Sequence, residues 1–541
     1  MSMFKKTKLA AAIASAGCAL IAGQASAVYV NEDGLGQALI YPYYTVRGDN
    51  MTLLSVVNTT NNAKIVKVRF REGKNTSDVL DFNLFLSRED VWTGAVLPTA
   101  DRGNGTGGAV LLSADTSCVT PTSDEAGNTF KTGIPFRIFD LPTDNDDAAT
   151  DTVDRLREGY VEIIELATVP NASPLGLDVT HNNGSATVAR TPTCSLVAGL
   201  TSANARTRGQ TTSNTIDNLA APSGGLFGAA TYLNAPVGGA TSVEAVALAD
   251  FWGSVNRAGR YDLPSVDTPN LGSGEARSVV VNGTDVYISN WSVGDGLDGF
   301  RATTAVLMRD GVYNEYAYTN DKVFSTDWVV TMPSKRYFVN QGIYQLLPGV
   351  GPFYYYAAEA PFQRAYRTGT GSCDDVSLAS YDREEGRGGG SGASFSPVRP
   401  GAAPNALCWE ANVISIGNAT AADEPSRVLG STNNLWFRAY QNNGQAVGSV
   451  GAAPQGEGGW AKLSFQQGST ITNNHQLVNN LGSNTVVSTA GVSNVASVTY
   501  NGLPVIGFSA TIANQGARAS YGTSVKHRYS RTITAGTVVT P

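Results

Sequence analysis

Charged residues and long apolar runs are scarce in this sequence. Only 15% of the 541 residues are charged, against about 25% in an average protein, and the formal net charge is −7. Clustered Lys and Arg recognise the phosphates of nucleic acids, so a sparsely charged acidic chain excludes DNA or RNA as its partner. No apolar run is long enough for a membrane helix, and we expect no transmembrane span.

Catalytic motifs are also missing. The only histidines, His181, His475 and His527, stand in no triad-like setting, and no G-x-S-x-G motif occurs. Three scattered histidines do not supply the ligand set of a catalytic zinc site. We therefore predict no catalytic residues and no enzyme activity.

Two neighbouring acids, Glu162 and Glu165, invite comparison with glycosidases, whose two carboxyl groups stand about 5 to 9 Å apart. In a strand these two positions point to opposite faces, so they cannot flank one glycosidic bond unless a bulge intervenes. We expect each acid to meet an arginine or a backbone donor at a sheet edge. Pairing of either acid with a distant one stays open.

The first 27 residues have the pattern of a signal peptide. Three lysines precede a small, apolar stretch, and Ala25-Ser26-Ala27 forms a cleavage box, so the mature chain is expected to begin at Val28. Lipidation of Cys18 is the alternative, but Ser15 stands where a lipobox carries a large aliphatic residue.

Four cysteines remain when the leader is removed. An even number in an oxidising compartment predicts disulfides, and of the three pairings we favour the sequence-local one. It joins Cys118 to Cys194 and Cys373 to Cys408. A four-cysteine zinc site is the competing interpretation, although no two of these residues have C-x-x-C spacing.

Alternation of polar and apolar residues indicates strands. In the stretch 64–71 the hydrophobic residues share one parity and Lys67, Arg69 and Arg71 share the other, which predicts a half-buried strand, and 80–87 repeats the pattern. Turn signals separate such stretches from long Gly-, Asn- and Ser-rich loops. The sequence therefore predicts an all-β fold of β-sandwich units, immunoglobulin-like or jelly-roll-like, with little helix.

The expected organisation is a signal peptide at 1–27, an N-terminal β-sandwich region with loop insertions at 28–310, and a C-terminal β-rich region at 311–541. The length of 541 residues agrees with more than one unit at roughly 150 residues each. One segment, 242–252, has the cap and the spacing of a short helix.

An acidic segment is the one candidate metal site. Its aspartates are Asp144, Asp146, Asp147, Asp151 and Asp154. Calcium takes about six to eight oxygen ligands from flexible acidic loops, but the spacing does not match an EF-hand. A calcium site and a solvated acidic loop are the two interpretations, and no other cofactor is expected.

Two further patterns have a functional and a structural interpretation. Arg47-Gly48-Asp49 spells the tripeptide that animal integrins recognise, and a Gly-Asp turn explains it equally well. The aromatic runs 41–44 and 353–356 fit sugar stacking as well as core packing. An exposed row of Trp or Tyr on one sheet face would favour sugar binding.

Several segments also carry a resemblance to known proteins. They read VYVNEDGLGQALIYPYYT (28–45), EGYVEIIE (158–165), TDWVVT (326–331) and GLPVIGF (502–508). They resemble a group of secreted, largely uncharacterised β-rich proteins of proteobacteria that are often labelled cell-surface proteins. The resemblance implies an address outside the cell and transfers no catalytic residue.

These observations favour an exported structural or interaction protein of the bacterial cell surface or extracellular matrix, with the periplasm as the other location. Self-association or contact with other surface components is expected. A secreted module that binds carbohydrate or calcium is the alternative, and a secreted hydrolase is the second alternative.

The leader generates the first testable prediction. Edman sequencing and the mass of the N-terminal peptide of the exported protein will identify Val28 as its first residue, without lipid, because the cleavage box ends at Ala27. A diacylated N-terminal Cys18 would contradict this expectation.

Overall fold

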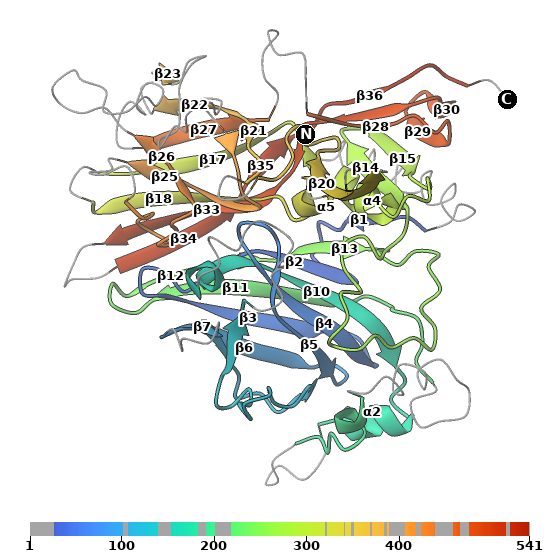
Figure 1. Cartoon of the computed structure of the whole chain (residues 1–541). Helices are drawn as coiled ribbons and strands as arrows, with labels where there is room; N and C mark the ends of the chain where they lie inside the picture. The colour runs from blue at the N-terminus through green and yellow to red at the C-terminus, as the bar shows by residue number, and fades with distance from the viewer. Residues whose placement is uncertain are drawn as a thin grey trace, which may run out of the picture.

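Strands in several antiparallel sheets make up most of the structure (Figure 1). The computed structural model describes residues 26–100, 106–138, 153–181, 191–200, 218–319, 322–339, 341–347, 351–367, 371–382, 387–388, 406–417, 424–438, 458–465, 475–514 and 520–539. Across these ranges, no helix is long and apolar enough to cross a membrane. The predicted all-β, sandwich-type fold is confirmed.

Two large sheets form the lower body in Figure 1, coloured blue to green. The seven-stranded sheet runs β1 (Tyr29–Val30), β13 (Val246–Ala249), β2 (Ala38–Thr45), β10 (Glu158–Val169), β4 (Ala63–Glu72), β5 (Asp78–Leu86) and β8 (Cys118–Thr120). The six-stranded sheet runs β12 (Gly239–Glu244), β11 (Leu226–Asn234), β3 (Asn50–Asn58), β6 (Val91–Thr99), β7 (Thr106–Leu112) and β9 (Ile134–Arg137).

Two five-stranded sheets form the upper left body, coloured yellow to red in Figure 1. One runs β23 (Arg387–Gly388), β22 (Ser377–Asp382), β27 (Gly458–Ser464), β17 (Gly311–Ala317) and β35 (Arg528–Ser530). The other runs β26 (Asn434–Arg438), β25 (Ala411–Gly417), β18 (Phe324–Thr331), β33 (Ile506–Asn514) and β34 (Ser520–Lys526), and its β25–β26 pair is parallel.

Smaller elements complete the fold, many of them at the upper right of Figure 1. A four-stranded sheet joins β14 (Arg277–Asn282), β15 (Asp285–Asn290), β29 (Asn484–Ser488) and β30 (Gly491–Val495), and a three-stranded sheet joins β28 (Gln476–Asn479), β31 (Val498–Asn501) and β36 (Ile533–Ala535). The strand pairs are β16 (Met308–Arg309) with β32 (Leu503–Pro504), β19 (Gln341–Leu347) with β20 (Gly351–Ala357), and β21 (Asp374–Asp375) with β24 (Ala406–Leu407). The helices are α2 (Pro174–Val179), α4 (Asp298–Leu307) and α5 (Lys335–Val339), with 3-10 turns η2 (Val153–Arg157) and η3 (Val197–Gly199).

The predicted strands at 64–71 and 80–87 are β4 and β5. The hydrophobic parity of β4, Val66, Val68 and Phe70, is fully buried in the core between the two large sheets. Trp92 of β6 and Leu54 of β3 approach the same core from the six-stranded sheet. The period-2 pattern therefore identified the sandwich interior correctly, because alternate side chains of a strand point to one face.

This core continues into the upper left body. Val329 of β18, Ala411 of β25 and Phe508 of β33 belong to the same cluster, and the rings of Phe508 and Tyr232 stack with their centroids 5.3 Å apart. Strands from both sides of residue 310 also pair in the four-stranded sheet. The domain boundary near residue 310 stays a prediction. The shared core and the shared four-stranded sheet both join residues on the two sides of this boundary.

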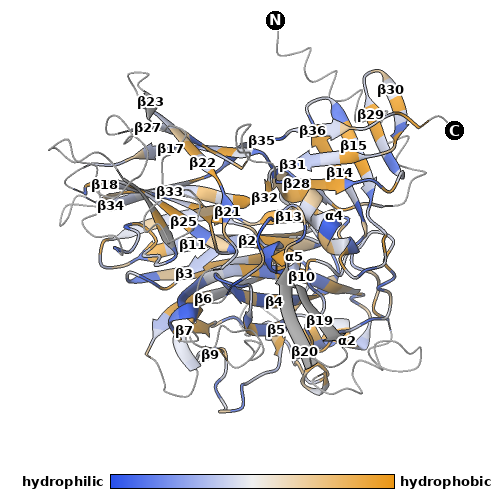
Figure 2. Cartoon of the chain, turned by 45° about the horizontal axis from the view of Figure 1, so that its top comes forward, coloured by the Kyte–Doolittle hydropathy of each residue, from blue (hydrophilic) through white to orange (hydrophobic). Residues whose placement is uncertain are grey.

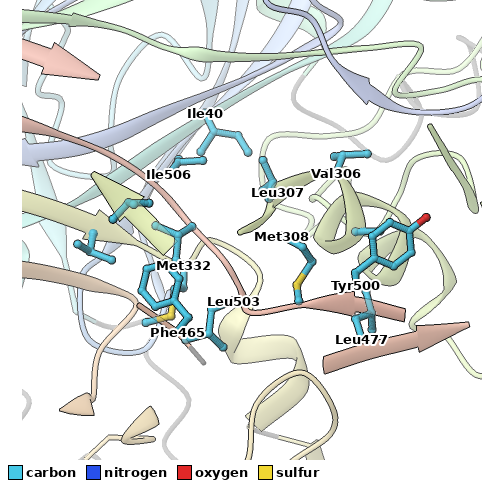
Figure 3. Close-up of a cluster of buried hydrophobic side chains, with 14 of the residues drawn as sticks. Ile40, Val306, Leu307, Met308, Met332, Phe465, Leu477, Tyr500, Leu503 and Ile506 are labelled. Atoms are coloured by element: carbon cyan, nitrogen blue, oxygen red, sulfur yellow. The ribbon is translucent and has the colours of Figure 1, made fainter. Parts of the chain in front are cut away.

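A second cluster lies where the smaller elements meet the large sheets. Figure 3 shows Ile40, Met332, Leu503 and Ile506, from three segments far apart in the sequence, among its members. Hydrophobic segments, orange in Figure 2, include β14 and parts of α5. Burial of this cluster attaches α4 and the C-terminal strands to the rest of the fold.

The helix predicted at 242–252 is wrong. The segment forms the end of β12 and then β13, which pair with β11 and β2. Val243, Ala245 and Ala247 are buried in the sandwich core, while the residues between them are more exposed. Leu248 is also buried, but in the second cluster, so β13 is covered on both faces near its end. Two sheet partners stabilise the strand conformation here, and they outweigh the local preference for a helix.

The two predicted disulfides are present. One joins Cys118, on β8, to Cys194, and the other joins Cys373 to Cys408 beside the β21–β24 pair. Each links segments of the same region, and the zinc alternative is excluded because all four cysteines are bonded in pairs.

His527 connects the two sheets of the upper left body. Its Nε2 lies 2.9 Å from the carbonyl oxygen of Val329, so Nε2 donates, and its Nδ1 lies 3.0 Å from the side-chain amide of Asn314. Burial lowers the pKa of His527 to about 4, because the charged ring would lose its hydration.

This imidazole generates a pH prediction. The unfolded chain takes up the proton near pH 6.5 while the folded protein resists it until about pH 4, so stability is lost as the pH falls through that window. Urea unfolding from pH 4 to 7 will show a slope that is steeper in wild type than in His527→Gln, by up to about 1.4 kcal/mol per pH unit. Above pH 7 the difference between the two proteins will be constant. Equal slopes in both would contradict the assignment.

Candidate functional site

The polar face of β4 is buried as well, so the strand is not half-buried as predicted. Lys67, Arg69 and Arg71 are each at most 2% exposed. A loop that follows β13 covers them: the amine of Lys67 donates to the carbonyl of Pro264 at 2.9 Å, and Arg69 donates to that of Asp267 at 2.8 Å. The alternation correctly separated the two faces, but it carries no information about a distant segment that covers one of them.

Carboxylates on β5 and β10 neutralise these cations. Arg71 lies 2.7 Å from Asp78 and 3.6 Å from Glu162, and Lys67 lies 3.2 Å from Asp81. Burial lowers the pKa of Lys67 to about 8, while burial raises the pKa values of Asp81 and Glu162 against the attraction of the cations. For these three groups loss of hydration outweighs pairing, whereas the carboxylates around Arg71 raise its pKa despite its burial.

Glu162 and Glu165 are separated as expected from a strand. Glu162 pairs with Arg71, whereas Glu165 lies 2.8 Å from the amine of Lys64 and accepts the backbone N–H of Gly224 at 2.8 Å. The expected partners, a cation or a backbone donor, are confirmed. Their expected position is wrong, because β10 is an inner strand between β2 and β4 and lies at no sheet edge.

A pocket of about 670 Å³ opens beside this charged layer. Its lining includes carboxylates from distant segments, Asp81, Asp124 and Asp267, together with the guanidinium groups of Arg71 and Arg336. Such a lining can hold a polar ligand that both donates and accepts hydrogen bonds.

The pocket carboxylates are engaged by cations. Asp81 lies 3.2 Å from Lys67, Asp267 lies 3.6 Å from Arg69, and Asp124 lies 3.8 Å from Arg137. A hydrolytic pair needs one carboxyl group to give up a proton and another to act as base or nucleophile, and ion pairing restrains both roles. The absence of catalytic residues stays a prediction.

An aromatic row lies on one face of the β23–β22–β27–β17–β35 sheet. The rings of Tyr381 and Trp460 stack with their centroids 4.3 Å apart and their planes 16° apart. The ring centroid of Tyr313 lies 6.4 Å from that of Trp460. Trp460 is 43% exposed. Because the rings cover one another, the row has few free ring faces for sugar stacking, which uses the π face.

The two aromatic runs singled out in the sequence have different outcomes. Tyr41, Tyr43 and Tyr44 are fully buried and belong to the sandwich core, as the packing interpretation expects. The side chains of 353–356 lie outside the part of the chain that the structure describes.

His181 has neighbours that sequence reasoning missed. Its Nε2 lies 3.1 Å from the hydroxyl of Thr116, and its Nδ1 lies 3.0 Å from that of Ser87 and 3.5 Å from Asp90. Hydroxyl, imidazole and carboxylate in this order recur in hydrolases. Here the Asp90 carboxylate also accepts hydrogen bonds from the Ser87 backbone N–H and the Ser117 hydroxyl, so it stabilises the turn before β6.

Only Asp154 of the predicted calcium cluster lies within the described residues. Arg47 holds its carboxylate at 2.8 Å and also lies 2.6 Å from Glu158. Asp144, Asp146, Asp147 and Asp151 lie outside the described residues. Within the described ranges, no group of three or more acids, histidines or cysteines is arranged to hold a metal, and calcium stays a prediction.

The same contacts distinguish between the two interpretations of the Arg47-Gly48-Asp49 tripeptide. Arg47 is only 7% exposed and is enclosed by two carboxylates, so its guanidinium is not presented to a receptor. The structural interpretation of this motif is therefore correct.

The outer face of the six-stranded sheet is apolar and carries no charge on its four inner strands. Its outward positions, all half-buried or exposed, are Met51, Leu53, Ser55 and Val57 on β3, Phe227, Ala229, Thr231 and Leu233 on β11, Val91, Thr93, Ala95 and Leu97 on β6, and Val110 and Leu112 on β7. A shallow groove of about 480 Å³ runs over Leu53, Thr93 and Leu112. We call these fourteen positions the outer face.

The outer face follows from the sequence of its strands. β3, β6 and β11 have hydrophobic residues at both parities, a composition that is typical of strands covered on both sides. Their inward residues fill the sandwich core, yet none of the described segments covers the outward ones. Contiguous exposed apolar surface of this kind marks interaction sites.

The buried charged layer generates a stability prediction. Arg71→Met removes the cation that pairs with Glu162 and the nearer of the two that pair with Asp78, so the free energy of unfolding will fall by about 3 to 5 kcal/mol. Lys526→Gln removes an exposed pair with Glu244 and is the matched control, with a loss below about 1 kcal/mol. Chemical denaturation measures both, and equal losses would show that the layer is not energetically special.

Comparisons of the chain with protein-family models, with curated proteins and with solved structures found no match. The resemblance to secreted proteobacterial proteins therefore stays a prediction, and the function is argued from the geometry of this structure.

Proposed function

We propose that this chain is an exported structural or interaction protein of the bacterial cell surface, and that its copies associate through the outer face of the six-stranded sheet. The observation that carries the proposal is the combination of exposure, apolar composition and lack of charge on that face. A signal-peptide pattern and two disulfides support an address outside the cytoplasm.

The outer face has the dimensions of a protein interface. Strands lie about 4.8 Å apart and rise about 3.4 Å per residue, so four strands of seven to nine residues cover roughly 600 Å². Stable complexes bury about 800 Å² per partner, and side-chain relief adds to the flat area. A second copy therefore matches the size of the face.

Charge favours a second copy as the occupant. Two copies with a net charge of −7 each repel one another, and contact costs least where neither carries a charge. The polar residues in the middle rows, Ser55, Thr93 and Thr231, are small and neutral, which allows two sheets to approach to about 10 Å. A two-fold axis would pair the face with itself.

The edge of this sheet is a weaker candidate for association. β12 lies beside β34, where Ser524 donates to the carbonyl of Ser242 and Lys526 pairs with Glu244 at 2.9 Å. Strand addition from another chain needs free backbone groups, and these contacts occupy part of that edge.

The other two function classes have less support. Carbohydrate binding through the aromatic row meets the obstacle that Tyr381 and Tyr313 already cover Trp460. Hydrolysis in the pocket meets the obstacle that Asp81 and Asp267 are paired with cations.

Oligomeric state tests the proposal. Purified wild-type protein will form dimers or larger assemblies in analytical ultracentrifugation, and Leu53→Lys will weaken them by roughly tenfold or more in Kd, because a buried unpaired charge has lost its hydration. Val525→Lys places the same charge at an exposed site on β34, away from the outer face, and will leave association unchanged.

Measurements with and without calcium separate a metal-driven assembly from one driven by the face. A protein that stays monomeric under both conditions at all concentrations would contradict the proposal. So would assembly that Leu53→Lys and Val525→Lys weaken to the same extent.

A further inference from the structure

A pocket of about 400 Å³ lies between the lower body and the upper left body. Its lining comes from several strands, among them β1, β13, β33 and β35. Part of the lining is apolar and packs with the second hydrophobic cluster, including Val30, Val246 and Val312. Arg309 of β16 lines the same pocket and is only 4% exposed. The pocket therefore combines an apolar surface with a buried guanidinium group.

The guanidinium of Arg309 uses only part of its hydrogen-bonding capacity. Its Nη1 donates to the carbonyl oxygens of Val306, at 3.0 Å, and of Met308, at 2.8 Å. The other N–H groups are on Nη2 and Nε, and neither atom has a hydrogen-bond partner in the part of the chain that the structure describes. These donors are left for a ligand in the pocket.

The charge of Arg309 also lacks a carboxylate. No described acid lies close enough to form an ion pair with it, and the acid that acts on it at longer range, Glu32, is exposed and accepts the hydroxyl of Tyr529 at 3.0 Å. Burial and the neighbouring Arg531 lower the pKa of Arg309. Because a guanidinium stays protonated in proteins, this direction means an uncompensated charge and not a neutral side chain.

The C-terminus of α4 compensates this charge only in part. Nη2 of Arg531 donates to the carbonyl of Val306 at 2.6 Å, and its Nε donates to that of Met308 at 3.2 Å, so two guanidinium groups share the same pair of oxygens. A helix C-terminus carries about half a negative charge. Helix capping therefore explains the contacts of Nη1 of Arg309 and leaves positive charge over.

Arg71 shows how the same fold treats an ordinary buried guanidinium. It is at most 2% exposed, like Arg309, but it lies 2.7 Å from Asp78 and 3.6 Å from Glu162. These carboxylates raise the pKa of Arg71, whereas that of Arg309 is lowered. Burial of an arginine in this protein thus comes with carboxylates at one site and with an open pocket at the other.

We propose that this pocket binds a monocarboxylate with an apolar body, whose two oxygens accept hydrogen bonds from Nη2 and Nε of Arg309. These two nitrogens present parallel N–H donors, the arrangement that matches both oxygens of a carboxylate. The ring of Tyr529 lies 3.8 Å from Cζ of Arg309 and restrains the plane of the guanidinium. The apolar lining takes up the body of the ligand.

The other charges of the pocket favour a monoanion. Lys526 and Glu244 both line it, and they pair with one another at 2.9 Å, so together they add little net charge. Arg309 and Arg528 then stand against Glu32 alone. A single negative charge balances this remainder. Phosphate carries more charge and has no apolar body to fill the rest of the pocket.

Isothermal titration calorimetry of the mature, disulfide-bonded protein tests the proposal, with hexanoate as the probe. Hexanoate will bind with one molecule per chain, whether or not the chains associate, because its carboxylate meets Arg309 and its alkyl chain meets the apolar lining. 1-Hexanol lacks the charge and phosphate lacks the alkyl chain. Each will bind about tenfold more weakly than hexanoate, or weaker still.

Three variants locate the site. Arg309→Met will weaken hexanoate binding by about tenfold or more, because it removes a charged donor. Arg364→Met is the matched control, since it removes a partly exposed arginine outside the pocket, and it will leave the affinity unchanged. Glu32→Gln removes a repelling charge from an exposed position, so it will tighten the binding of hexanoate and leave that of 1-hexanol unchanged.

A wild-type protein without saturable hexanoate binding overturns the proposal. Equal affinity for hexanoate and 1-hexanol overturns the role of the guanidinium, and equal affinity for hexanoate and phosphate overturns the carboxylate class. Equal losses in Arg309→Met and Arg364→Met overturn the assignment of the site. If Arg309→Met does not fold, Glu32→Gln decides, and an unchanged affinity for hexanoate in that variant overturns the assignment.

Discussion

The burial of cations on β4 is the constraint on which the architecture depends. Lys67, Arg69 and Arg71 project from an inner strand, so each needs a carboxylate or a carbonyl oxygen within reach. β5 and β10 supply part of that shell, and the loop before β14 supplies the rest through backbone oxygens. Tyr337 of α5 contacts the same layer through Arg71, which ties the upper body to the lower one.

The distribution of polarity across the lower body is the reverse of that of an ordinary sandwich. The seven-stranded sheet buries a charged face beneath loops, whereas the six-stranded sheet exposes a face without charge. Of the four faces of the two large sheets, three are covered by other described segments. Only the outer face of the six-stranded sheet is not covered by any described residue. This asymmetry, and no single residue, is the reason for proposing an interaction role.

Some of the fold and the candidate site followed from local patterns. The parities of β4 and β5, the two disulfide pairs and the separation of Glu162 from Glu165 depend on neighbours along one strand or on simple counting. The misassigned helix at 242–252 shows the limit, because Val243 and Ala247 are held by strands that lie far away in the sequence. The buried Lys335–Asp374 ion pair had no local signal at all, since its two members come from separate segments.

The sequence by itself determined that the chain is built of strands and which residues of a strand share a face, because these properties arise within short stretches. It favoured one of three cysteine pairings, and the structure shows that this pairing is formed. Tertiary structure alone decided which of those faces is buried and which charges meet. Burial depends on the segment that covers a face, as the loop around Pro264 covers Lys67 while nothing described covers Leu53. The segment that covers a face is far away in the sequence, so the alternation of residues along a strand does not reveal it.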